Sequence, residues 1–569
     1  MNKYSFRYPL EYLDKSLFFR LKPAVSSDLE IDGSGESNLY SNICNPRTQL
    51  AKTAMSEMSN IYTTDTAYLK QTQRVIDTVC ITHEGEPDNS FDINDDFCKE
   101  FEEIQAEWNS DYFKEKYSYL EWEMVDNLNY SSDFLQAQSF INLSSPLLGL
   151  LIPIIFLIFP FILIRIKNIP ISFQEYLDTL KEISRHHFIG KLLSVQTMSF
   201  ENIVYILGMA GLFGLQTYQN VKSCILFYRH TKEMNEHLFT LKKYVTQSKN
   251  TINNFVKLHS KKSKYHLFCK KSADVSKVLE KMEEEMACIT DFSVSFGKFR
   301  QIGYMLKTYY SIYSIPEYRQ CLEYSAKFHG YLQCLEGIHE NVKLGYLGKT
   351  QYYPKSSLRM KNIFYLAHLG KDVVKNDFIL KNNRIITGVN ASGKTTFLKT
   401  AVINIILSQQ FGYGCFSKCK MTPYEYIHSY INIPDTSGRD SLFQAESRRC
   451  KEIIDIIEKN KESRHFCIFD ELYSGTNPEE ATKSAISFLK YLAKRKNVSF
   501  ILTTHYLDVC RSLEKDPRID NYMMCVEKRE DGTFEYTYKT ESGISNMKGG
   551  IEILKNMDYP EEILEELRL

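Results

Sequence analysis

The sequence predicts an α/β domain of the P-loop type at its carboxyl-terminal end, preceded by a mainly α-helical region with one long hydrophobic segment. Three observations lead to this fold class. After about Lys361, apolar strand-like runs alternate with helical patterns, as they do in an α/β sheet. A loop with two glycines separates a strand-like run from a helical run at 388–393. Upstream, residues 146–164 carry no charged or strongly polar side chain.

Length and charge narrow the range of functions. A chain of 569 residues exceeds one ordinary hydrophobic core, so we expect about two to four domains. Lys and Arg together number 70, and so do Asp and Glu, so binding to nucleic acid would need a local basic patch. The 14 cysteines show no paired metal-binding spacing with histidine, which indicates reduced thiols and no zinc site. The first residues lack a long apolar run, which argues against a secretory signal.

Two regions are predicted before the hydrophobic segment. Residues 1–63 include the turn-rich stretch SSDLEIDGSGESN at 26–38, so we expect a loosely structured leader there. Residues 64–145 follow a helical pattern and are predicted to form a helical region.

A transmembrane helix is predicted at 146–166. Its uncharged residues would cross a hydrocarbon core of about 30 Å as a helix, and Arg165 and Lys167 close the run. Because no Lys or Arg lies at 126–145, the carboxyl-terminal side is expected to face the cytosol. The protein would then be membrane-associated, with its α/β domain cytosolic. The alternative is a buried core helix in a soluble cytoplasmic protein.

The next region, 167–353, is predicted to form a core or lever of long helices. Within it, 203–228 is a second apolar stretch interrupted by polar residues, which fits a second membrane segment, a re-entrant segment or a bundle helix. Six lysines lie close together at 257–271, with Tyr265 and Phe268 between them. Such a run can contact the phosphates of DNA or anionic lipid, or it can keep an exposed helix tip in solution.

The loop at 388–395 has the spacing of a nucleotide-binding P-loop. Gly388-x-x-x-x-Gly393-Lys394-Thr395 follows the apolar run RIIT and precedes the helical run TFLKTAVINIILS, which is the context that this motif requires. The glycines let backbone amides surround phosphate, Lys394 contributes positive charge, and the Thr395 hydroxyl can reach Mg²⁺. We therefore predict that ATP is bound by Gly388, Asn390, Ala391, Ser392, Gly393, Lys394, Thr395 and Thr396.

Two further segments supply candidate catalytic groups. The apolar run HFCIF leads to Asp470, a candidate Mg²⁺ ligand together with Thr395, and to Glu471, a candidate general base for the attacking water. The strand-like run VSFILTT leads to His505, where a polar side chain can contact the γ-phosphate or its water. Lys394, Glu471 and His505 are thus the predicted catalytic residues of a Mg²⁺-dependent ATPase.

These motifs resemble those of the MutS family of ABC-type ATPases over about 200 residues. TGVNASGKTT is similar to T-G-P-N-x-x-G-K-S-T, DELYSGTNPEEA to D-E-x-x-x-G-T, and TTHY to A/T-T-H-Y. SGRDSLFQAE resembles S-G-x-S-x-F-x-x-E, the segment that in this family reaches the ATP of the partner subunit. The resemblance implies a homodimer in which Ser441 acts in trans, and a role on DNA in mismatch repair or recombination.

The chain also departs from the family pattern. Val389 replaces the loop proline, Asp440 adds one residue before Ser441, and the R-H-P triplet is reduced to His368. The aromatic residue that stacks on adenine in relatives would fall near Val373. We identify no amino-terminal mismatch-reading domain, so the resemblance is to a divergent MutS-type ATPase and lever, with a hydrophobic segment in place of the DNA-reading part.

Two functions are consistent with these interpretations. In the first, 354–569 is a MutS-type ATPase domain whose nucleotide state moves helical levers on DNA. In the second, the chain is a membrane-anchored mechanical ATPase that acts on a protein or lipid client. The lysine run and the family resemblance favour the first function, and the hydrophobic segment favours the second.

Overall fold

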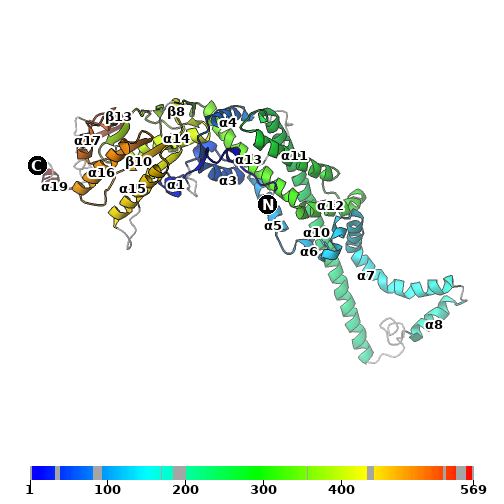
Figure 1. Ribbon diagram of the computed structural model, residues 1–569. Helices are drawn as coiled ribbons and strands as arrows, with labels where there is room; N and C mark the ends of the chain where they lie inside the picture. Colours follow the sequence, from blue (N-terminus) through cyan, green and yellow to red (C-terminus); the bar gives the residue numbers. More distant parts are fainter. Residues whose placement is uncertain are drawn as a thin grey trace. The chain divides into compact units, whose positions relative to one another are not determined.

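The computed structural model describes residues 3–31, 39–80, 93–167, 170–183, 200–354, 357–431, 433, 441–529, 534–545, 547 and 559–566. Figure 1 shows their helices and strands. The chain divides into two compact units. The α/β unit comprises Met1–Cys98, Ser248–Ser276 and Glu323–Leu569, and the helical unit comprises Lys99–Gln247 and Lys277–Leu322.

The α/β unit is built around a six-stranded sheet. In spatial order its strands are β13 (Phe534–Ser542), β12 (Ile519–Lys528), β6 (Asn383–Thr387), β11 (Val498–Thr504), β10 (His465–Asp470) and β9 (Tyr426–Tyr430). Neighbouring strands from β12 to β9 are parallel, and β13 is antiparallel to β12. Because parallel strands end at the same edge of a sheet, the segments that follow β6, β10 and β11 meet there.

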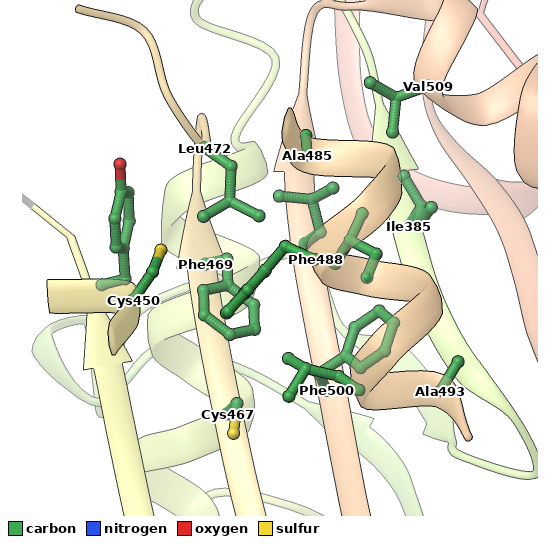
Figure 2. Close-up of a cluster of buried hydrophobic side chains, with 14 of the residues drawn as sticks. Ile385, Cys450, Cys467, Phe469, Leu472, Ala485, Phe488, Ala493, Phe500 and Val509 are labelled. Atoms are coloured by element: carbon green, nitrogen blue, oxygen red, sulfur yellow. The ribbon is translucent and has the colours of Figure 1, made fainter. Parts of the chain in front are cut away.

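Three helices form a hydrophobic core with this sheet. They are α15 (Leu442–Lys459), α16 (Pro478–Ala493) and α17 (Leu507–Leu513). Figure 2 shows Phe469 of β10, Phe488 of α16 and Phe500 of β11 close together in this core. The rings of Phe469 and Phe488 meet edge-on, with centroids 5.4 Å apart. Burial of each ring stabilises the fold by about 1.5–3 kcal/mol, so the core anchors the strand that ends at Asp470.

α14 (Lys394–Gln410) contacts both this sheet and a second, five-stranded sheet. All its residues from Phe397 to Gln410 are buried, as expected for a helix that other elements enclose on every side. Because α14 is enclosed, its amino end is held in a defined position, directly after the loop that follows β6. In spatial order the second sheet consists of β5 (Asn376–Ile379), β4 (Leu358–Ile363), β8 (Lys418–Met421), β3 (Gly348–Tyr352) and β7 (Tyr413–Gly414).

The amino-terminal residues form short elements that are hydrogen-bonded to the rest of the α/β unit, where the sequence predicted a loosely structured leader over 1–63. Gln410 Nε2, at the end of α14, donates a hydrogen bond to Ser59 O at 2.7 Å, and Tyr40 donates its hydroxyl to Gln410 Oε1. All but two of these elements have six residues or fewer, too few to show a hydrophobic period in the sequence. The elements are η1 (Pro9–Tyr12), β1 (Phe18–Arg20), α1 (Pro23–Asp28), α2 (Ser41–Cys44), α3 (Gln49–Ser59), β2 (Ile61–Thr63) and α4 (Thr66–Thr78).

The described elements of the helical unit are all helices. Near its centre, Glu107 accepts hydrogen bonds from the hydroxyls of Tyr117 at 2.6 Å and Tyr309 at 3.1 Å. The helices that lie wholly or partly in this unit are α5 (Asp95–Trp108), α6 (Phe113–Lys116), η3 (Glu123–Tyr130), α7 (Ser132–Ile166), α8 (Phe173–Ile183), α10 (Phe200–His259), α11 (His266–Met286), α12 (Phe296–Ser314) and α13 (Pro316–Lys343).

In the part of the chain that the structure describes, no helix combines the length and the apolar character that crossing a membrane requires. The predicted transmembrane helix at 146–166 is therefore not supported, and neither is a second membrane segment at 203–228. Residues 146–166 form the second part of α7, and 203–228 lie in the first part of α10. An apolar run in a sequence does not by itself distinguish a membrane span from another kind of helix.

Candidate nucleotide site

The loop between β6 and α14 is compact. Ala391 has φ 60° and Gly393 has φ 92°, so the chain enters the left-handed region twice before α14 begins. A Cβ at Gly388 would lie 2.8 Å from Ser392 Oγ, and that hydroxyl donates a hydrogen bond to Val389 O at 2.7 Å. The absence of a side chain at Gly388 therefore lets the loop close around Ser392.

The side chain of Lys394 turns back into this loop. Its Nζ atom donates hydrogen bonds to Gly388 O at 3.1 Å and to Val389 O at 3.2 Å. Burial lowers the pKa of Lys394, and the carboxylates of Glu471 and Asp470 oppose this effect. An anion would stabilise such a buried ammonium group, and the amino end of α14 favours an anion at the same place.

Two hydroxyls hold the carboxylate of Asp470 at the end of β10. Thr395 Oγ1 donates to Asp470 Oδ2 at 2.8 Å, and Thr503 Oγ1 donates to Asp470 Oδ1. Thr503 is the residue opposite Asp470 in the register of β10 and β11, so strand pairing brings these two side chains together. The carboxylate is thereby fixed beside the first turn of α14.

Glu471 and His505 form a pair next to Lys394. Glu471 Oε1 lies 2.9 Å from His505 Nε2, and the same nitrogen lies 3.0 Å from Lys394 Nζ. This nitrogen donates to Glu471 when it carries a proton, and accepts from Lys394 when it does not. The hydrogen bond from His505 lowers the pKa of Glu471, whereas burial opposes this effect.

The backbone at Glu471 is strained. Its φ is 52°, a conformation that costs on the order of 1–3 kcal/mol for a residue other than glycine and that is concentrated at functional sites. Its amide donates a hydrogen bond to Thr503 O at 3.0 Å, so β11 helps to hold the strained residue in place.

A cavity of about 680 Å³ adjoins these groups. Part of its wall is polar and charged, and part is apolar and aromatic. This combination suits a ligand with phosphates at one end and a planar ring at the other. The polar part includes Asn390, Ala391, Gly393, Lys394, Thr395, Thr396 and Glu471, and the apolar part includes Phe364, Tyr365, Val373, Met524 and Tyr538.

The residues present fit a magnesium ion that is bound together with a nucleotide. The Thr395 hydroxyl and the Asp470 carboxylate are in contact, and Mg²⁺ prefers oxygen ligands of this kind. Among the residues that the structure describes, no group of three or more His, Cys, Asp and Glu side chains is arranged to hold a metal. The other ligands would therefore be phosphate oxygens and water, which Mg²⁺ ordinarily retains.

A model of one protein family, MutS domain V, matches residues 384–568. The match begins in β6 and includes Lys394, Asp470, Glu471 and His505. The carboxyl-terminal part of this chain is similar to the MutS family. The resemblance inferred from the four motifs is therefore confirmed.

Individual MutS relatives match the chain over a limited extent. The DNA mismatch repair protein MutS of Lysinibacillus sphaericus is 27% identical over 201 residues, which are 34% of this chain and 23% of that protein. The corresponding protein of Staphylococcus haemolyticus is 24% identical over 259 residues, or 44% and 29%. Endonuclease MutS2 of Clostridium novyi is 29% identical over 201 residues, or 35% and 25%. The matched segment thus spans about a quarter of the length of these relatives.

Within the MutS domain V, the structure brings most of the predicted site residues together. Lys394 contacts His505, which contacts Glu471, and Thr395 contacts Asp470. The two groups are adjacent because Lys394 precedes Thr395 and Asp470 precedes Glu471 in the chain. The loop residues surround this set or line the adjoining cavity. Ser441 is not among the residues that line the cavity.

Tyr538 lies against the loop and was not singled out by the sequence analysis. A Cβ on Gly393 would come within 3.1 Å of Tyr538 Cδ1, and Asn376 Nδ2 donates a hydrogen bond to Tyr538 O at 2.9 Å. Tyr538 and Gly393 are far apart in the sequence. They meet because β13 pairs with β12 and β12 pairs with β6, a topology that no local motif of the MutS domain encodes.

Ser441 caps the amino end of α15. Its Oγ accepts a hydrogen bond from Gln444 N at 3.3 Å, and Gln444 Oε1 accepts one from Ser441 N at 3.0 Å. This reciprocal arrangement is a capping box, so Ser441 has a structural role within its own chain. The contact of Ser441 with the ATP of a second subunit stays a prediction, and the inserted Asp440 lies outside the described residues.

Proposed function

We propose that the chain binds and hydrolyses ATP with Mg²⁺ at this site. The observation that supports the proposal most directly is the set of contacts among Lys394, Thr395, Asp470, Glu471 and His505. A buried cation, a pair of oxygen ligands and a carboxylate with a hydrogen-bonding partner meet at one cavity. Hydrolysis of a phosphoanhydride requires groups of these kinds.

Each of these side chains has a separate task in the proposal. Lys394 neutralises charge on the β- and γ-phosphates, which binds ATP and stabilises the charge that develops as the terminal bond breaks. Glu471 orients the attacking water and accepts its proton, and its lowered pKa keeps it ionised near neutral pH. His505 holds the carboxylate of Glu471 in position. Mg²⁺, when bound through Thr395 and Asp470, supplies further neutralisation of phosphate charge.

Two substitutions test the assignment because they should impair different steps. Lys394→Ala should weaken ATP binding by about 10- to 100-fold, since a charged hydrogen-bond donor is removed. Glu471→Gln should bind ATP with the parent affinity and hydrolyse it about 100- to 10,000-fold more slowly, since the base is removed. Equilibrium titration with a fluorescent ATP analogue and single-turnover hydrolysis separate the two effects. Hydrolysis at the parent rate by Glu471→Gln would exclude Glu471 as the base.

We further propose a homodimer that couples nucleotide state to movement of its long helices on DNA. The names of the relatives, which refer to DNA mismatch repair and to an endonuclease, support DNA as the client. Exposed lysines at the turn between α10 and α11 supply positive charge for phosphate contacts. Ser441, which caps α15, is the proposed contact with the ATP of the second subunit.

A further inference from the structure

The turn at 472–475, which directly follows Glu471, is held in place by the buried carboxylate of Glu446 on α15. Glu446 Oε1 accepts hydrogen bonds from Ser474 N and Ser474 Oγ, both at 3.0 Å, and Glu446 Oε2 accepts one from Gly475 N at 3.1 Å. Glu446 is only 2% exposed. A carboxylate withdrawn from water needs donors of this kind, so Glu446 and the turn fix each other.

The same turn also packs directly against the first residues of α15. A Cβ on Gly475 would lie 2.6 Å from Leu442 Cγ and 2.9 Å from Phe443 N, so the backbone of the turn lies against the start of the helix. The rings of Phe443 and Tyr473 have centroids 5.7 Å apart. The turn and the amino end of α15 therefore form one packed assembly, in addition to the hydrogen bonds of Glu446.

The turn needs this support because its backbone is strained at two positions. Glu471 has φ 52° and Tyr473 has φ 60°. Residues other than glycine keep such conformations only where surrounding contacts impose them. A displacement of α15 would therefore relax or distort the turn, and Glu471 would move with it.

We propose that Glu446 is a positioning residue that links Ser441 to Glu471 within one subunit. The proposal rests on the ATPase function and on the contact of Ser441 with the partner's ATP proposed above. Ser441 is the cap of α15 and Glu446 lies in its second turn. When Ser441 contacts the partner's ATP, α15 shifts, and Glu446 passes this shift to the turn that carries Glu471. Each subunit then hydrolyses its own ATP fastest when its partner is loaded.

The link predicts cooperativity in hydrolysis. The hydrolysis rate of the parent protein should rise more steeply with ATP concentration than a single hyperbola, with a Hill coefficient above 1, because loading of one site activates the other. Glu446→Gln keeps the shape of the side chain but replaces an acceptor oxygen by an NH₂ group that faces an N–H donor. This variant should lower kcat by about 10- to 100-fold through misplacement of Glu471. It should leave the ATP dissociation constant unchanged and bring the Hill coefficient to 1.

Two further variants complete the experiment. Glu452→Gln changes an exposed carboxylate on the same helix and should behave as the parent does. Gly475→Ala disturbs the packing of the turn against Leu442 while Glu446 is retained, and it should reproduce the loss of kcat and cooperativity. Thermal unfolding of each variant shows whether it is folded, and if Glu446→Gln does not fold, Gly475→Ala decides the question.

The outcomes separate this link from the ATPase function itself. If Glu471→Gln loses hydrolysis but Glu446→Gln keeps the parent kcat, the ATPase assignment holds and the link is overturned. A fall in kcat with the parent Hill coefficient intact would also overturn it, because Glu446 would then act only on local structure. A parent protein with a Hill coefficient of 1 overturns it as well. Undiminished hydrolysis in Glu471→Gln would instead contradict the ATPase assignment.

Discussion

At the scale of single residues, substitution of Tyr538 tests where the base of the proposed nucleotide lies. Its ring lies beside Gly393 and lines the cavity, and stacking of a base on an aromatic ring contributes about 1–3 kcal/mol. Tyr538→Ala should therefore raise the ATP dissociation constant by about 5- to 150-fold, whereas Tyr538→Phe should bind as the parent does. Inorganic tripolyphosphate, which has no base, should bind all three proteins equally. Parent-like ATP binding by Tyr538→Ala would remove Tyr538 from the site.

The pair of Glu471 and His505 predicts a shift in pH dependence. Glu471, the proposed base, must be ionised to accept a proton, and the hydrogen bond from His505 lowers its pKa. In the parent, the acid limb of kcat/KM, which reports groups of the free enzyme, should therefore lie below the usual glutamate pKa of about 4.3. His505→Ala removes the largest cause of the lowering, so its acid limb should move to higher pH. Acid limbs at the same pH in both proteins would contradict the pairing.

The residues that the sequence predicted and those that it missed differ in one physical respect. Lys394 and Thr395 follow one another in a loop whose spacing is itself the motif, and Asp470 and Glu471 end a single apolar strand. Tyr538 reaches the site through the pairing of three strands. The carboxylate of Glu446 was part of a recognised motif, but its contacts with Ser474 and Gly475 depend on how α15 packs.

At the scale of elements, the turn between α10 and α11 and the helix ends beside it present part of the lysine run to solvent. Lys257, Lys261 and Lys270 are exposed. Lys264 instead forms an ion pair with Asp65 at 2.6 Å, and Lys271 donates to Lys3 O. The aromatic residues of the run, Tyr265 and Phe268, are completely buried. Contacts with DNA at this turn would therefore be made with phosphates and not by stacking on bases.

Replacement of the three exposed lysines by glutamine should lower DNA affinity and weaken its salt dependence. For each phosphate that a lysine no longer neutralises, the slope of log affinity against log salt becomes shallower by about 0.9. Binding measured by fluorescence anisotropy at several salt concentrations gives both quantities. Lys264→Gln is the matched control, because its charge is already paired within the protein. An unchanged slope in the triple variant would exclude this turn as the DNA-binding surface.

Some elements could not be assigned from the sequence, because the local hydrophobic pattern does not show whether a segment is buried in the folded protein. The apolar run at 146–166 is only the second part of α7, and a sequence pattern does not reveal what surrounds a helix. The amino-terminal elements differ from this run, because they are buried although their sequence has no long apolar stretch. They are short and interrupted by turn residues, and their burial becomes evident only through hydrogen bonds such as that between Gln410 and Ser59.

At the scale of the whole molecule, the proposed homodimer can be tested by mixing inactive variants. Ser441→Ala and Lys394→Ala should each be nearly inactive. In a mixed dimer, the subunit with Ser441→Ala keeps an intact loop and receives Ser441 from its partner, so ATPase activity should partly return. Ser441→Asp keeps the helix cap but places negative charge opposite the phosphate, and should give the same complementation. No recovery, despite demonstrated subunit exchange, would exclude a trans role for Ser441.

The hydrogen bond from Gln410 to Ser59 has a consequence for synthesis of the chain on the ribosome. The two residues are 351 positions apart, and translation at about 5–20 residues per second separates their appearance by on the order of 20 to 70 s. During that interval Tyr40 and Met58, which are buried in the finished protein, lack the hydrogen bonds that they form with Gln410 of α14. The nascent amino-terminal segment therefore stays incompletely packed until α14 has been made, and we expect its folding to depend on chaperones more than its small size would indicate.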